Sequence, residues 1–518
     1  MGDQNTVLDR PQARHLLRRS GFGADEKVVK RWLDHGYTRG QAADDLVAFK
    51  PNNFKPSGLN QFRQHNNWVK FMLKAKSGLN EKLTLFWHDH FATGFSKVLS
   101  TKLMGKQNQY LRQNGKGSML DLVKGINRDP AMMEWLDTQR NYADDPNENY
   151  GRELMELFTL GVFDLNGTRN YSDQRDVFQV ARAFTGHRYD GRSAKTYFNQ
   201  GEHDFMADFD GDPVEEEDRG PKTIFGGDPD RPGGYGGYGA GGVSYVPVEG
   251  EGPTEIDRVT EGIFGHVDSD GKKTVARRTA RRLFEFFAHG GFASAPAGSD
   301  ERTAIDAVIM ASGFESNWNI GGLVREILVH DEFYESISYT GHVADTTKKS
   351  IKWPTDFLVS TMRTLGAKVL GPGAAVPGGK YDGVFFHLDG MGQIVLDPPS
   401  VFGWNWEAAW ISSQTLLARY LFAENVASAQ GTGAMKPDRF VVQEPLPDTD
   451  LVSLSDPGDI VDGVTDFLGV KDDLTSGERS TLITYLGGPL NLNDDQQRRR
   501  KLYGLIGLVL QSPAYQAH

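Results

Sequence analysis

The sequence predicts a mainly α-helical protein, organised as a single large multi-helix domain that carries a long insertion. Apolar residues recur at the spacing of one helix face along most of the 518-residue chain. The two-residue alternation of strands is scarce, and its best example is the short segment 242–248. Hydrophobic residues make up 38% of the chain, which is enough for a large core and argues against disorder of the whole chain.

The helices are expected in a regular succession along the chain. They are predicted at 28–33, 68–95, 119–135, 148–160, 172–184, 274–288, 322–333, 354–365, 412–430 and 498–511. Residues that favour helix ends support several of these boundaries. Asp129 precedes a proline at the first helical position, Ser172 is expected to cap the next helix, and Gly161 follows the end of 148–160.

One segment, 201–271, differs from the rest because it is rich in Gly, Asp and Tyr. Its most biased part is the Gly/Tyr run 233–239. A loop this long in a compact domain is usually functional or disordered. Helices of similar character flank it, so we interpret it as an insertion between an N-terminal half, 1–200, and a C-terminal half, 272–518, of one integrated unit.

The composition excludes several classes of site. There are no cysteines, so disulfides, zinc–thiolate sites, iron–sulfur clusters and cysteine nucleophiles are ruled out. No apolar stretch reaches the ~18 residues of a membrane span. The net charge is −12, and the basic runs 277–282 and 498–501 are expected to be solvated helix faces. We therefore expect no nucleic-acid surface. Residues 1–4 are polar and carry no signal peptide, which leaves a removed leader open.

A histidine pair stands in the apolar segment 83–91. On a helix, His90 lies on the apolar face with Phe86 and Trp87, whereas His88 and Asp89 point away. His88 and His90 would then be about 200° apart and could share a metal ion only if the helix ended near Trp87. Two interpretations stay open: a metal site, or a buried histidine held by hydrogen bonds.

The predicted helix 148–160 carries a second group of polar residues. Three charged residues spaced four apart form an expected surface ladder, namely Glu148, Arg152 and Glu156. Glu153 instead flanks the apolar stripe and is expected to face the interior. A buried carboxylate needs a partner or a raised pKa, and His90, Arg182 or a metal ion could be that partner. A satisfied buried ion pair is the alternative.

The insertion contains a group of acids that resembles the start of a calcium-binding loop, at Asp208, Asp210 and Asp212. The glycine is misplaced for an EF-hand, and Arg219 stands where the final glutamate belongs. A looser Ca²⁺ site remains a hypothesis, and 268–271 is a similar but weaker case.

Short motifs follow one another in order along nearly the whole chain. They include 14–23 (RHLLRRSGFG), 86–91 (FWHDHF), 129–132 (DPAM), 146–161 (PNENYGRELMELFTLG), 181–186 (ARAFTG), 203–204 (HD) and 398–404 (PPSVFGW). Together they resemble a family of uncharacterised bacterial proteins, domain of unknown function 1800. His187 departs from the family, which often has tryptophan there.

The resemblance implies a single helical unit that is commonly exported. It also implies a frequent neighbour, a secreted protein of phosphatase or sulfatase type, as a co-exported partner. It supplies no established reaction, so the site must be argued from this chain's residues.

Our leading hypothesis is an extracytoplasmic hydrolytic enzyme that depends on a divalent metal, either calcium or a transition metal. His90 would be a ligand or general base and Glu153 its carboxylate partner, with His88, Arg152 and Arg182 nearby.

Two other functions remain alternatives. A non-catalytic surface or assembly protein would use the Gly/Tyr-rich segment for contacts. A carbohydrate-binding protein would use Trp404, Trp406 and Trp410, which could equally belong to the core.

Overall fold

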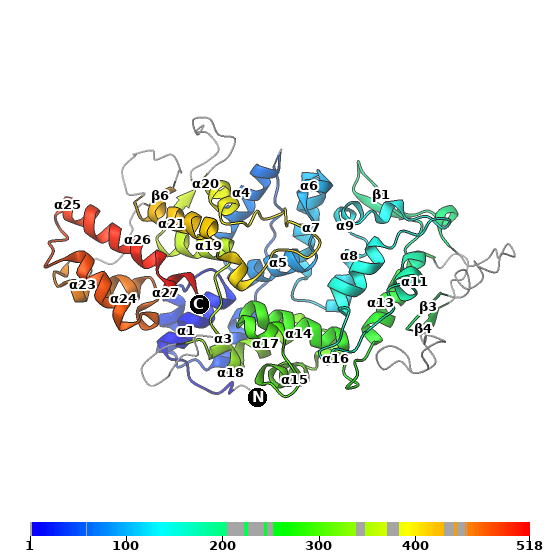
Figure 1. Ribbon diagram of the computed structural model, residues 1–518, viewed down its shortest axis with the longest axis horizontal. Helices are drawn as coiled ribbons and strands as arrows, with labels where there is room; N and C mark the ends of the chain where they lie inside the picture. Colours follow the sequence, from blue (N-terminus) through cyan, green and yellow to red (C-terminus); the bar gives the residue numbers. More distant parts are fainter. Residues whose placement is uncertain are drawn as a thin grey trace.

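Helices build most of the fold, as the computed structural model shows (Figure 1). The described residues are 3–58, 60–204, 222–225, 243–245, 252–337, 348–369, 383–428, 440–442, 451 and 453–518. The helices of the first part are α1 (Arg10–Ser20), α2 (Glu26–Asp34), α3 (Arg39–Val47), α4 (Gln61–Met72), α5 (Gly78–His90), α6 (Phe95–Val98), α7 (Thr101–Asn114), α8 (Met119–Ile126), α9 (Pro130–Trp135), η1 (Thr138–Arg140), α10 (Asn149–Glu153), the π-helix η2 (Leu154–Thr159), α11 (Asp176–Ala183) and η3 (Gln200–Glu202).

The second part continues in the same style. Its helices are α13 (Gly252–Gly265), α14 (Thr274–Phe287), η4 (Gly290–Ala293), α15 (Asp300–Ser312), α16 (Phe314–Asn317), α17 (Ile320–Val329), α18 (Asp331–Tyr334), α19 (Pro354–Thr364), α20 (Gly383–Gly390), η6 (Glu407–Trp410), α21 (Ser413–Ser428), α23 (Pro457–Phe467), η7 (Lys471–Asp473), α24 (Ser476–Leu486), α25 (Asp495–Gln497), the π-helix η8 (Arg498–Leu502), α26 (Tyr503–Gln511) and α27 (Pro513–Gln516). The mainly α-helical fold class is confirmed.

Strands contribute little to the described part of the chain. They form two-stranded antiparallel sheets that pair β1 (His187–Asp190) with β2 (Lys195–Phe198), β3 (Lys222–Ile224) with β4 (Val243–Tyr245), and β5 (Ala367–Val369) with β6 (Phe440–Val442). The expected strand at 242–248 corresponds to β4.

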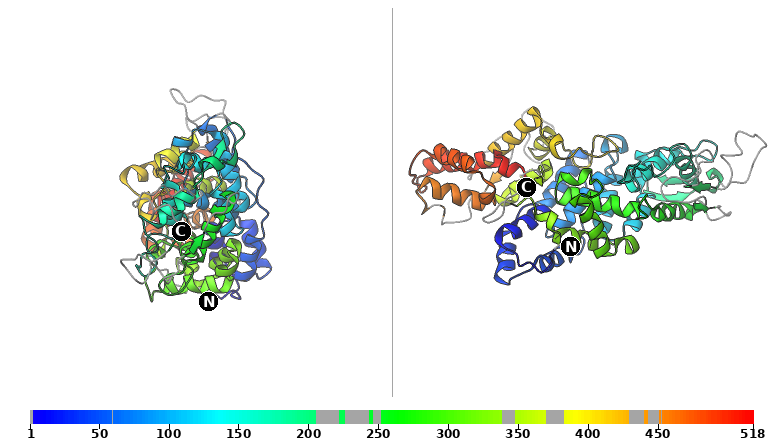
Figure 2. Two further views of the ribbon diagram at one scale, coloured as in Figure 1. Left: turned by 90° about the vertical axis from the view of Figure 1, so that its right-hand side faces the viewer. Right: turned by 60° about the horizontal axis from the view of Figure 1, so that its bottom comes forward.

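A continuous apolar core joins the two halves of the sequence. One cluster of buried hydrophobic side chains extends from Leu8 to Tyr515. In Figure 1, α23 to α26 form one end of the elongated body, and α11 and α13 lie at the other end. Figure 2 shows that the body is narrower when viewed along its long axis. The described residues contain no helix that is long and apolar enough to cross a membrane.

The segment 201–271 contains regular structure in its described parts. Its last third includes the helix α13, whose buried face carries Ile256, Val259 and Ile263. This face packs against α8 and α11. The C-terminal end of the segment is therefore part of the core.

Several expected helices have other boundaries than the periodicity suggested, and the expected helix 119–135 is divided into α8 and α9. The predicted helix 68–95 is two helices, α4 and α5, because Ser77 caps a new helix by accepting a hydrogen bond from the Asn80 amide. The predicted cap at Ser172 is wrong. Its hydroxyl accepts from the Arg175 amide in a turn at 3.3 Å, and α11 starts only at Asp176.

Helix α5 occupies the centre of the molecule, and every residue from Leu79 to His90 is buried. Its polar side chains therefore need internal partners. Glu81 pairs with Arg112 at 2.7 Å, and Lys82 pairs with Asp356 at 2.9 Å. His88 and His90 therefore lie on a helix that is buried on every face.

Candidate functional site

The two histidines of α5 do not share a site. The helix continues through His90, so the two rings point to different sides. His88 Nε2 accepts a hydrogen bond from the Leu396 amide at 3.0 Å, and His90 Nε2 lies 3.1 Å from the Phe158 carbonyl. Burial lowers the pKa of each ring to about 3, so both are neutral at physiological pH. The prediction that His90 faces aromatic side chains is confirmed by its contacts with Phe86 and Phe158.

Asp89, between the two histidines, is as buried as they are. It accepts from the Trp404 amide at 2.7 Å and from the Trp406 indole at 3.0 Å, with Arg282 3.6 Å away. Burial raises its pKa to about 7, against the effect of Arg282 and of these hydrogen bonds. Asp89 points away from the helix face of His90, as expected, and that side of α5 is also buried.

Glu153 lies at the junction of α10 and η2 and is half-buried. Burial and the neighbouring Glu156 raise its pKa to about 7, against the effect of Arg152. No hydrogen bond or ion pair joins Glu153 to His90 in the described part of the chain. The surface ladder is confirmed for its first step, Arg152 to Glu148 at 2.9 Å.

Arg182 belongs to a different cluster. This buried side chain forms a two-pronged contact with Asp204, at 2.7 and 3.3 Å. Close by, Glu255 binds both Lys222, at 2.8 Å, and His203, at 2.9 Å. These contacts join α11 and α13 to the two described pieces around 204 and 222, so Arg182 stabilises the base of the insertion.

Two groups of acids were predicted to bind calcium, one at 208–212 and a weaker one at 268–271. Asp208, Asp210 and Asp212 lie outside the described residues. Asp268 and Asp270 each bind Arg277 at 2.7 Å, so a guanidinium occupies the place proposed for a cation. Across the described ranges, no group of three or more His, Asp and Glu side chains is arranged to hold a metal ion.

A cavity lies between α14 and the loop that follows η2. Figure 1 shows α14 near the middle of the molecule. The cavity has a volume of about 230 Å³. Its wall includes Thr274, Arg277, Arg278 and Arg281 of α14, and the loop 160–165 faces them. The expectation that 277–282 is a solvated helix face is wrong here, because Arg277 is buried and Arg278 and Arg281 are half-buried.

The π-helix explains why Arg278 reaches this wall. Its wider turn takes the Leu160 and Gly161 amides to the Met155 carbonyl, at 2.9 and 3.0 Å. The Leu157 carbonyl then accepts from Arg278 Nη2 at 3.3 Å. Gly161 has a φ of +81°, and a Cβ there would lie 2.6 Å from Arg278 Nη1. Glycine at 161 therefore leaves the space that the guanidinium occupies.

The three arginines of the cavity differ in charge compensation. Arg277 is held by Asp268, Asp270 and Asp306. Arg278 has only its long bond to a carbonyl, and its Nε has no hydrogen-bond partner among the described residues. Burial and the neighbouring arginines lower its pKa to about 9. Arg281 donates to the Ala293 carbonyl, and its pKa is also lowered, first by burial. The cavity therefore presents two cations to which no carboxylate of the described ranges is bound.

A hydroxyl–imidazole pair adjoins the arginines. The Oγ1 atom of Thr274 lies 2.7 Å from Nδ1 of the buried His266. Burial lowers the pKa of His266 to about 4, while a hydrogen bond with the Asn170 backbone and the charge of Asp164 act in the opposite direction. A neutral imidazole can accept the hydroxyl proton, so this pair has the composition of a nucleophile and its base.

Sequence reasoning missed this cavity. The arginines 277, 278 and 281 were visible as a basic run, and Thr274 stands one helical turn before them. Arg278 donates to the Leu157 carbonyl of η2, and the π turn of η2 carries no periodicity signal. His266 lies in the part of 201–271 that we interpreted as insertion.

The tryptophans proposed for carbohydrate binding belong to the core. Trp404 and Trp410 are each 4% exposed. Trp406 donates to Asp89 and stacks on Arg282, 3.9 Å from the ring centre. They offer no open aromatic platform, and the Gly/Tyr run proposed for assembly contacts lies outside the described residues.

The comparisons with other proteins place the chain in one family. No curated protein and no solved structure matches it. A family model, described as protein of unknown function (DUF1800), matches residues 15–517, which is nearly the whole chain. The chain therefore belongs to the DUF1800 family.

Proposed function

We propose that the protein binds a small organic anion, carrying a phosphate, sulfate or carboxylate group, in the cavity lined by Arg278 and Arg281. The observation that carries the proposal is the incomplete pairing of Arg278, whose Nε is buried without a hydrogen-bond partner among the residues that the structure describes. Guanidinium groups bind planar oxyanions through paired hydrogen bonds. A bound oxyanion would supply both the missing acceptor and the missing negative charge.

The electrostatics of the cavity wall support an anion over a cation. The acids that line the cavity, Asp164 and Asp268, are already saturated. Asp164 accepts from the amides of Asn166 and Thr168 and from Ser269. Asp268 accepts from two amides and from Arg277. Arg278 and Arg281 are the cations that remain for a ligand.

The second part of the proposal is hydrolysis of an ester of that anion. The Thr274 oxygen would bond to the acyl, phosphoryl or sulfuryl centre while its proton passes to His266 Nδ1. The leaving alcohol would take that proton as its bond to the centre breaks. Water, deprotonated by the same ring, would then release the acid and restore Thr274. This hydrolytic route uses no metal ion.

Binding is tested with inorganic phosphate, sulfate and citrate as probes in isothermal titration calorimetry. Arg278→Met should raise the Kd of the probe that binds most tightly by about tenfold or more, because it removes the cation and keeps an apolar side chain of similar length. The matched control is Arg325→Met, which removes an equal charge from a surface arginine bound to Asp44. Absence of binding, or equal losses in both variants, would refute the proposal.

Hydrolysis is tested with the nitrophenyl esters of phosphate, sulfate and acetate. Thr274→Ser should retain turnover, whereas Thr274→Ala and His266→Gln should lose it. If anions bind but the wild-type protein turns over none of these esters, the hydrolytic part is wrong and the site is a binding site only.

We also propose that the protein acts outside the cytoplasm with a co-exported phosphatase- or sulfatase-like partner. The absence of cysteine supports the location, since an exported chain without thiols avoids stray oxidation. Cell fractionation tests the location. Co-purification from the native host tests the partner, and recovery of the protein alone in the cytoplasmic fraction would contradict both.

A further inference from the structure

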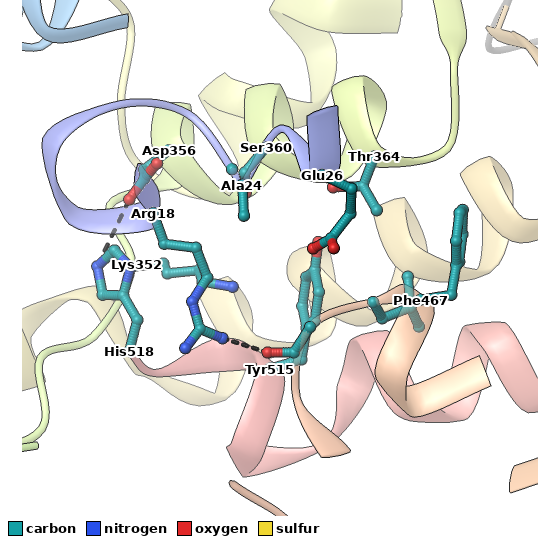
Figure 3. Close-up of a pocket in the computed structure, with 13 residues that line it drawn as sticks. Arg18, Ala24, Glu26, Lys352, Asp356, Ser360, Thr364, Phe467, Tyr515 and His518 are labelled. Atoms are coloured by element: carbon teal, nitrogen blue, oxygen red, sulfur yellow. Dashed lines mark hydrogen bonds and ion pairs between the residues drawn. The ribbon is translucent and has the colours of Figure 1, made fainter. Parts of the chain in front are cut away.

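A second, smaller cavity lies near the C-terminal end of the chain and is independent of the arginine-lined cavity. Figure 3 shows its lining residues, with Arg18, Lys352 and His518 grouped on one side. The cavity has a volume of about 30 Å³. That is room for about two waters or one monatomic ion, and it is too little for an organic substrate.

The chain closes this cavity by pairing two distant segments. Ser350 and His518 exchange backbone hydrogen bonds at 3.0 and 2.9 Å, and the Lys352 amide donates to the Gln516 carbonyl at 3.0 Å. These bonds fix Lys352 and His518 side by side. Lys352 is only 3% exposed, and it lines the cavity.

Lys352 has no anionic partner at its charged end. Its Nζ makes no hydrogen bond to any described residue and lies 3.7 Å from the centre of the Tyr515 ring. Burial and the charge of Arg18 lower the pKa of Lys352 to about 7, while Asp356 acts in the opposite direction. A buried ammonium without a counter-charge is costly, so the site favours an added negative charge.

The acids near the cavity are committed to other cations. Asp356 pairs with Lys82 at 2.9 Å and lies 3.5 Å from His518 Nε2, the contact drawn in Figure 3. Glu26 pairs with Arg14 at 2.7 Å and with Arg10 at 3.1 Å. These two acids therefore leave Lys352 without a carboxylate among the described residues.

Two arginines of α1 add positive charge near His518, and Arg18 belongs to the cavity wall. Arg18 donates to the Gly469 carbonyl and lies 3.5 Å from Asp473, which Lys349 also binds, at 3.1 Å. The buried Arg19 donates to three backbone carbonyls and to no carboxylate.

We propose that this cavity is a binding site for a monatomic anion, chloride under physiological conditions, held by Lys352 with Arg18 and His518 around it. The size of the cavity selects a single small ion, and the unpaired ammonium supplies the charge. The ion would lock the pairing of 350–352 with 516–518 by binding to groups on both segments. This proposal does not depend on the function proposed for the arginine-lined cavity.

The test uses the full-length protein in chloride-free gluconate buffer. Thermal unfolding is followed while chloride replaces gluconate at constant ionic strength. Wild-type protein should gain stability saturably, and Lys352→Met should lose this response. The variant should still fold, because it replaces an unpaired buried charge with an apolar side chain of similar length. Lys348→Met, which removes the partner of Glu332, is the matched control and should respond like the wild type.

A structural readout locates the ion. Crystals grown with bromide should give an anomalous peak within hydrogen-bond distance of Lys352 Nζ, and the peak should be absent in Lys352→Met. Equal stabilisation by gluconate and chloride, an unchanged response in Lys352→Met, or water density without an anomalous peak would each overturn the proposal.

Discussion

The buried pair of Glu81 and Arg112 gives the sharpest test of how α5 is held in the core. Both side chains are 0% exposed, and Arg112 donates to the two carboxylate oxygens at 2.7 and 2.9 Å. Glu81 also accepts from the Trp68 indole at 2.9 Å and from Asn52 at 3.1 Å. Glu81→Gln keeps the shape but replaces one acceptor by a donor and leaves the guanidinium uncompensated. Breaking a buried pair in this way costs about 3–5 kcal/mol.

The same chemical change on the surface provides the control. Glu148→Gln removes a pair with Arg152 whose side chains are 36% and 38% exposed, and such pairs contribute about 0.3–0.5 kcal/mol. An unfolding entropy of about 1.1 kcal/mol/K for 518 residues converts these costs into a fall in Tm of about 3–5 °C for Glu81→Gln and under 1 °C for Glu148→Gln. Thermal unfolding followed by circular dichroism measures both. Equal shifts would refute the argument that burial sets the cost.

Three further predictions follow from single residues. Gly161→Ala should lower the free energy of unfolding by about 1–2 kcal/mol, since the φ of Gly161 is +81°. It should also weaken anion binding, because the new Cβ displaces Arg278. An unchanged Tm and an unchanged anion affinity would contradict this prediction. Glu153 has a folded pKa of about 7 against an ordinary 4.5, so the folded protein keeps a proton that the unfolded chain loses, and stability falls as pH rises between these values. Glu153→Gln should remove the part of this loss of stability that comes from Glu153. If the free energy of unfolding of the two proteins depended on pH in the same way, the pKa of Glu153 would not be raised. Thr38→Ala should lower the free energy of unfolding by about 1 kcal/mol, because Thr38 and Gln41 form a capping box at the start of α3. An unchanged free energy of unfolding in urea would exclude this role.

The helical fold was predictable because most helices keep one apolar face. Asp129 and its following proline marked the start of α9 correctly, since its carboxylate accepts from the Met132 amide at 3.0 Å. The central helix α5 was harder. Its polar side chains point in all directions and still lie in the interior, since they find partners far along the chain, such as Leu396 for His88 and Trp404 for Asp89. A local pattern contains no information about such partners.

The sequence predicted a site near the arginine-lined cavity but not the cavity itself. The Phe158 carbonyl that His90 faces and the Leu157 carbonyl that binds Arg278 are adjacent in η2, so the expected histidine region borders the arginine-lined cavity. The link between them is the π turn. Charge alone suggested a solvated face for 277–282, because the sequence does not show which side of α14 the rest of the chain covers.

The π turn also has a consequence for how this segment tolerates insertions and deletions. Each residue in an α-helix advances the side-chain direction by about 100°, and a π turn holds one residue more than an α turn. Deleting one residue within Leu154–Thr159 would therefore restore regular α winding, and the residues on both sides would keep their directions. Glu153, whose pKa is about 7, would keep its place at the junction of the two helices. The segment should thus tolerate the loss of a single codon, whereas the same deletion in the regular helix α5 would turn one part of the helix by about 100° relative to the other.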